Sequence, residues 1–167
     1  MTENIKKTIL IFSFFIGLLV TSAGYNKTSL NTTIGKTIPE IADENINNAL
    51  RQCEQDGKYV LLSFWSTSDG LSRQSVNDYT SWLKSNGNNK IDLLSVNFDK
   101  SERLFQEIVK RDGLFSDMQF NVSGNQAYKL KNEFHLDNGY GSLLLDPNGK
   151  IIAHNPTREQ LEDIVLS

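Results

Sequence analysis

Few side chains in this chain of 167 residues have the chemistry of a nucleophile or a metal ligand: one cysteine, Cys53, and two histidines, His135 and His154. A lone cysteine cannot form an intramolecular disulfide, although an accessible one could act as a redox thiol through mixed disulfides. Cys53 follows Ile46 and Leu50 at helical spacing, and a place on this apolar stripe favours a buried small hydrophobe. The histidines have no metal-ligand spacing with each other, with Cys53 or with an acidic cluster, so neither a metal nor another cofactor is expected.

Apolar runs predict the strands that would position any site. Residues 59–65 and 91–98 are nearly continuous apolar runs, typical of strands buried on both faces of a sheet. The shorter segments are expected to be a strand around 118–122 and a hairpin of 143–145 with 151–153 about the turn 146–149.

Helical patterns fill the intervals between these strands, and three capping signals mark where helices begin. One helix is predicted from Glu44 and another after Gly70. The predicted caps are Asp99 with Glu102 three residues later, Asn125, and Thr157 with Gln160 three residues later. Buried strands joined by crossover helices imply a parallel pair, to which the terminal hairpin adds antiparallel strands. We therefore predict an α/β fold with a central mixed sheet, a C-terminal antiparallel hairpin and helices on both faces.

The start of the chain differs in kind from the rest. A short basic stretch, an apolar run over residues 9–20 and small residues after it predict a signal peptide over residues 1–23. The run is too short to span a bilayer comfortably, so cleavage is favoured over the alternative of an uncleaved anchor. A flexible polar leader is expected over 24–36 and one globular domain over 37–167.

This pattern predicts an exported protein, periplasmic or secreted, without a stable membrane span after signal cleavage. No cysteine follows the apolar run, so the chain is not expected to be a lipoprotein. The formal net charge is −3, and no long run of Lys or Arg could follow a phosphate backbone. Nucleic acid is therefore not an expected partner.

Two separated motifs resemble the thioredoxin superfamily. The sequence GKYVLLSFW over 57–65, followed by Arg73, is similar to the motif region of exported thiol-disulfide proteins of the TlpA/ResA and thiol-specific-antioxidant type. The resemblance continues through 93–99 and resumes with LLLDPNGK over 143–150. It covers roughly residues 36–166 and implies a thioredoxin-like three-layer fold.

The departures from that family concern its active site. Where the family has Trp-Cys-x-x-Cys-Arg, this chain has Ser-Asp-Gly-Leu-Ser-Arg, which places Asp69 and Ser72 at the two cysteine positions. Neither side chain can exchange disulfides, because exchange requires an attacking thiolate and a second thiol. We expect Asp69 to cap the following helix, and Ser72 could be a nucleophile only with a base beside it. The family's cis-proline position holds Tyr140, where we expect a trans peptide.

Two hypotheses of function remain, from different classes. In the first, the chain is a non-catalytic module that binds a protein or peptide partner on the former substrate face, residues 66–73 with 138–141. Its expected binding residues are Trp65, Ser68, Asp69, Gly70 and Tyr140. In the second, it is a thiol-disulfide oxidoreductase-family protein of envelope redox homeostasis that acts through Cys53 or through cysteines of a partner.

Overall fold

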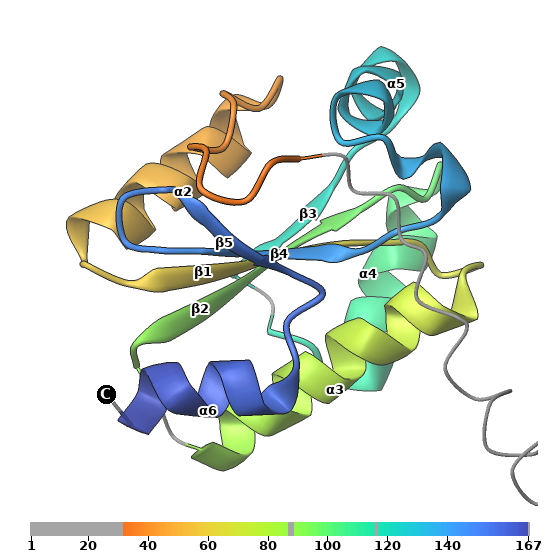
Figure 1. Cartoon of the computed structure of the whole chain (residues 1–167). Coiled ribbons are helices and arrows are strands. Elements are labelled where there is room, and N and C mark those ends of the chain that lie inside the picture. The colour runs from red at the N-terminus through yellow and green to blue at the C-terminus, as the bar shows by residue number, and fades with distance from the viewer. Residues whose placement is uncertain (1–31, 87–88, 116, 167) are drawn as a thin grey trace, which may run out of the picture.

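The computed structural model describes residues 32–86, 89–115 and 117–166 of the chain. The predicted signal peptide over 1–23 and most of the predicted leader lie outside the described residues. Within the described part, a five-stranded sheet forms the middle of the molecule (Figure 1).

The sheet is mixed, as predicted from the sequence. Its strand order is β3-β2-β1-β4-β5. Strand β1 runs parallel to β2, with Tyr59 opposite Ile91, and β2 runs parallel to β3, whereas β4 is antiparallel to both β1 and β5. The bounds are Tyr59–Trp65 for β1, Ile91–Asn97 for β2, Gln119–Asn121 for β3, Ser142–Leu145 for β4 and Ile151–His154 for β5.

Helices cover both faces of this sheet, so the fold has three layers, with the sheet between two layers of helices. Helices α2 and α5 lie on one face, and α3, α4 and α6 lie on the other (Figure 1). The bounds are Glu44–Gln55 for α2, Gly70–Asn86 for α3, Glu102–Asp112 for α4, Gly124–Glu133 for α5 and Arg158–Leu166 for α6, with a 3-10 turn over Leu136–Asn138. The predicted three-layer arrangement is confirmed.

Apolar side chains of the strands pack between the sheet and the helices on each face. Phe64 and Leu94 pack with α2 and α5, whereas Leu61 and Leu93 face α3 and α6. Phe64, Leu61 and Leu94 have no exposed surface. Burial of such a side chain contributes about 1.5–3 kcal/mol, so these two clusters hold the sheet between its helices.

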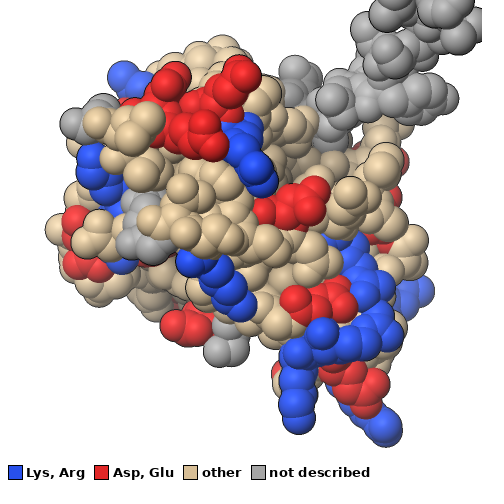
Figure 2. All heavy atoms as spheres, turned by 90° about the horizontal axis from the view of Figure 1, so that it is seen from below, with Lys and Arg blue, Asp and Glu red and all other residues tan. Residues whose placement is uncertain are grey.

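Figure 2 shows the face of the molecule that α3, α4 and α6 cover. On this face Lys and Arg are interspersed with Asp and Glu, and they do not form a continuous basic surface. Some of them pair along a helix, as Arg103 does with Glu107 on α4 at 3.0 Å. No helix among the described residues is long and apolar enough to cross a membrane.

Of the caps predicted for α4, α5 and α6, the first two are wrong. Helix α4 is capped by Ser101, whose Oγ accepts a hydrogen bond from the Leu104 N–H at 3.2 Å, because the Asp99 carboxylate is used elsewhere. Helix α5 begins after Ser123 instead of at Asn125.

The third predicted cap is confirmed as a reciprocal pair. The Thr157 N–H donates to Gln160 Oε1 at 2.9 Å, and the Gln160 N–H donates to Thr157 Oγ1 at 3.3 Å. This capping box satisfies two backbone donors at the start of α6.

The end of the predicted leader is part of the fold. The Gly35 N–H donates to Ile151 O at 2.7 Å, and the Ile151 N–H donates to Lys36 O at 2.9 Å. Thr32 Oγ1 also lies 3.0 Å from His154 Nε2. The pairing corrects the predicted boundary, since the folded part of the chain begins before residue 37. Backbone hydrogen bonds to an edge strand do not require apolar side chains. The polar composition of this segment therefore did not predict the pairing.

Candidate functional site

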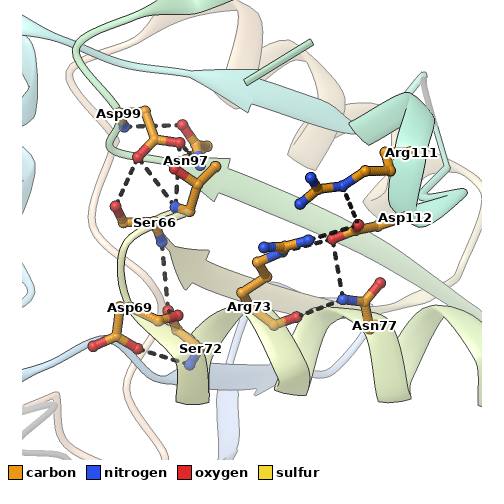
Figure 3. Close-up of polar contacts among 10 residues, drawn as sticks. Ser66, Asp69, Ser72, Arg73, Asn77, Asn97, Asp99, Arg111 and Asp112 are labelled. Atoms are coloured by element: carbon orange, nitrogen blue, oxygen red, sulfur yellow. Dashed lines mark hydrogen bonds and ion pairs between the residues drawn. The ribbon is translucent and has the colours of Figure 1, made fainter. Parts of the chain in front are cut away.

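The two motif positions, Asp69 and Ser72, are occupied with holding the start of helix α3. Asp69 Oδ1 accepts a hydrogen bond from the Ser72 N–H at 2.8 Å, so the predicted helix cap is confirmed (Figure 3). The buried Ser72 Oγ donates to Asp69 O at 3.2 Å and accepts from the Ser66 N–H at 3.4 Å. Both partners of the Ser72 Oγ are backbone groups, and neither is the side-chain base that would activate a serine as a nucleophile.

A buried carboxylate holds the loop that leads into this helix start. Asp99, which is 8% exposed, accepts hydrogen bonds from Ser66 Oγ at 2.7 Å, from the Thr67 N–H at 3.1 Å and from Asn97 Nδ2 at 2.9 Å (Figure 3). Asn121 Nδ2 in turn donates to Asn97 Oδ1 at 2.8 Å. A carboxylate at the end of β2 therefore fixes the loop after β1, and a network with these donors satisfied is rigid.

Arg73, the last residue of the motif, ties α3 to α4. Its Nε and terminal nitrogen donate to the two oxygens of Asp112 at 2.6 and 2.7 Å, a two-pronged ion pair (Figure 3). Asn77 Nδ2 donates to Asp112 as well, at 3.3 Å. The hydrogen bonds from Arg73 hold the pKa of the Asp112 carboxyl below its ordinary value, because they favour its ionised form.

A groove of about 540 Å³ lies between helix α3 and the loop 138–142. The α3 side contributes Asp69 and Ser72, and the loop contributes Tyr140 between its two glycines. The other lining residues are Ser63, Phe64, Leu71, Gln74, Ser75, Asp78, Tyr79, Asn138, Ser142 and Asn155. The fold thus brings Asp69 and Tyr140, from distant parts of the sequence, to one groove.

Tyr140 is held in place by aromatic packing. Its ring stacks on Phe98 with centroids 5.3 Å apart, and Lys131 Nζ lies 5.4 Å from each of these two ring centroids. The peptide bonds of the described residues are trans, including the one before Tyr140. The half-buried Tyr140 ring is therefore held in position at the side of the groove. Its loop lacks the cis-proline of the family that the sequence resembles.

Three of the five expected binding residues do not line the groove. Trp65 is wrong as a binding residue, because it has no exposed surface and packs against Phe105 at a centroid distance of 6.1 Å. Ser68 and Gly70 are exposed but lie outside the lining, and Ser68 Oγ instead lies 3.1 Å from Ser66 Oγ. Successive side chains of a strand point to opposite faces of the sheet, and Trp65 lies on the face that α4 covers. The sequence motif does not show on which face this side chain lies.

Leu71 lines the groove but is absent from the sequence prediction. It is 76% exposed, whereas Val76, Trp82 and Leu83 of the same helix are buried. The signal was present in the sequence, since Leu71 lies one position away from the α3 stripe that Ser72, Val76 and Leu83 form. An exposed apolar side chain beside a groove is a suitable contact for a ligand.

Cys53 is remote from the groove and closed to solvent. It is 1% exposed in the core between α2 and the sheet, and its Sγ lies 3.6 Å from Asp92 Oδ2. Burial, reinforced by the Asp92 carboxylate, raises the pKa of the Cys53 thiol to about 12. The thiol is therefore protonated at neutral pH. Cys53 is buried among apolar side chains, as predicted from its place in the helix.

The histidines are not gathered with other metal-binding side chains. His154 contacts Thr32, and His135 is exposed just before the 3-10 turn. Within the described part of the chain, no group of three His, Cys, Asp or Glu side chains could hold a metal ion.

Comparisons with solved structures define the fold class. The chain is similar to a thioredoxin-like protein from Parabacteroides distasonis, with 28% identity, a TM-score of 0.66, and coverage of 81% of this chain and 96% of that one. It is also similar to the thioredoxin domain of a thiol-disulfide oxidoreductase from Bacteroides vulgatus, with 20% identity, a TM-score of 0.63, and coverage of 80% and 99%. A thiol:disulfide interchange protein from a Bacteroides species matches with 18% identity, a TM-score of 0.62, and coverage of 81% and 92%.

No protein-family model matches the chain, and no curated protein matches it significantly. The structural neighbours and the sheet order nevertheless agree, and the chain is a member of the thioredoxin-like superfamily by fold. The predicted resemblance is confirmed at that level.

The Asp69 cap predicts a stability difference between two substitutions. Asp69→Ala should lower the free energy of unfolding by about 1 kcal/mol, because it removes the acceptor for the Ser72 N–H. Asp69→Asn should lower it much less, since asparagine caps helices about as well as aspartate. Urea unfolding of both variants measures this, and an equal loss in both would mean that charge, and not capping, sets the contribution.

The Arg73–Asp112 pair predicts a pH dependence of stability. The pKa of Asp112 is lowered in the folded state, so the pair stabilises the fold above the unfolded pKa of about 3.9 and loses this contribution as pH falls through the folded pKa. The unfolding free energies of wild type and Asp112→Asn should therefore differ most above about pH 5 and converge at lower pH. Chemical denaturation across this range is the measurement, with the exposed Asp137→Asn as control; a constant difference would contradict the assignment.

Proposed function

We propose that this protein is a non-catalytic thioredoxin-like module that binds a protein or peptide segment in the groove between α3 and the loop 138–142. One observation carries the proposal: Asp69 and Ser72 are engaged in the helix cap while the adjacent groove remains accessible. Leu71 offers an apolar contact on one wall and Tyr140 on the other. The thioredoxin fold thus presents a binding surface without the sulfur chemistry that its neighbours' names describe.

The absence of a second cysteine supports a non-catalytic role. Disulfide exchange needs a thiolate that attacks and a second thiol that releases the mixed disulfide. The sequence contains Cys53 alone, and this thiol is buried in a different part of the fold from the groove. The alternative hypothesis, redox action through Cys53, would require the α2 layer to open.

Export belongs to the same proposal. The signal-like pattern over residues 1–23 supports it, and a module without a dithiol would meet its partner in the envelope or outside the cell.

The buried thiol predicts slow chemistry. In the native protein, Cys53 should react with iodoacetamide at neutral pH at least about a hundredfold more slowly than in urea-unfolded protein, because its pKa of about 12 leaves little thiolate. Mass spectrometry of the alkylated protein gives both rates. Wild type and Cys53→Ser should be equally inactive in a disulfide reductase assay, and turnover by wild type alone would restore the redox alternative.

The groove predicts a contact map. A photo-crosslinking amino acid at position 71 should form discrete adducts in the envelope fraction, and these should fall at least about fivefold when Tyr140→Ala removes the opposite wall. Position 128 provides the matched control, because Tyr128 is 67% exposed and lies outside the groove. Adducts of equal yield from both positions, or none from position 71, would contradict binding at the groove.

A further inference from the structure

One face of helix α3 forms the long wall of the groove. Leu71, Gln74, Ser75 and Asp78 line it at spacings i, i+3, i+4 and i+7, which places them in one row. At a rise of about 1.5 Å per residue, Leu71 and Asp78 are separated by about 10 Å along the helix axis. The groove therefore has an apolar end at Leu71 and an acidic end at Asp78.

The two ends also face different surroundings. Tyr79 Oη donates to Pro156 O at 3.3 Å, which places the Asp78 turn of α3 beside residues 155–156. Lys131 does not line the groove, but its Nζ lies 5.4 Å from the centroid of the Tyr140 ring at the other end. A second cation would thus be repelled near Tyr140 and accepted near Asp78.

The carboxylates of the groove are not neutralised by neighbouring bases. Among the described residues that line it, two are acidic, Asp69 and Asp78, and none is Lys or Arg. Asp78 is exposed, and its side chain makes no hydrogen bond or ion pair with another described residue. Arg73, on the same helix, is held by Asp112 and does not line the groove. The groove consequently favours a ligand that brings its own positive charge.

We infer, on the basis of the function proposed above, that the groove selects extended peptide segments with an apolar side chain and a Lys or Arg two to four positions away. The apolar side chain lies between Leu71 and Tyr140, and the base pairs with Asp78. An extended chain rises about 3.3 Å per residue, so about three residues cover the distance between the two ends. The flexible stem of Lys or Arg accommodates the neighbouring spacings.

A peptide-display selection tests this specificity. A library of random eight-residue peptides is selected on the purified wild-type protein, on Asp78→Lys and on Asp137→Lys, an exposed control with the same change of charge outside the groove. Wild type and Asp137→Lys should enrich Lys and Arg near an apolar residue, whereas Asp78→Lys should lose that enrichment. For a selected peptide, Asp78→Asn should raise the Kd about two- to fivefold, the range of an exposed ion pair, and should remove its salt dependence.

The outcomes separate the specificity from the groove itself. If the peptides selected on wild type and Asp78→Lys have the same charge, or if Asp137→Lys shifts the selection equally, the inference about the base is overturned while binding at the groove stands. If no peptide is enriched on wild type over Leu71→Asp, binding at the groove fails, and the inference fails with it.

Discussion

The buried carboxylate of Asp99 determines where the groove begins. It lies at the end of β2, yet it accepts hydrogen bonds from the loop after β1, at Ser66 Oγ and the Thr67 N–H. Removal of such a carboxylate would leave buried donors unpaired, and each unpaired donor costs about 1–3 kcal/mol. The loop from Ser66 to Asp69 is therefore held in one conformation, and the start of α3 with it. Leu71 and Asp78 can line a groove only because that helix starts at a fixed place.

The start of α3 favours negative charge, and in this chain the negative group is a carboxylate. Aligned N–H groups at a helix N-terminus stabilise an anion, whether it is a thiolate or a carboxylate. Here the anion is Asp69, and one of its oxygens accepts the Ser72 N–H. The same backbone feature that favours a reactive thiolate in a dithiol protein therefore contributes stability in this one. One fold can in this way carry different side chains at the same helix start.

The groove and the thiol occupy separate parts of the molecule. Cys53 does not line the groove, although it belongs to the same apolar cluster as Phe64, which does. The Arg73–Asp112 pair joins α3 to α4 and adds rigidity on the groove side. Binding by a preformed surface loses less conformational entropy than binding by one that must be ordered first.

The sequence by itself determined the strands and their arrangement. The apolar run of β1 and the Asp-Pro-Asn-Gly turn of the hairpin report local geometry, and local signals do not depend on distant residues. Thr157 and Gln160 are a further example, because a capping box needs only residues three positions apart. The Asp69 cap was predictable for the same reason. Only the tertiary structure decided which groups the Asp99 carboxylate binds, because its partners lie at the end of another strand. It also decided the face on which Trp65 lies, because the burial of that side chain depends on α4. It also decided that Leu71, Asp78 and Tyr140 line one groove, since their proximity results from strand pairing between distant segments.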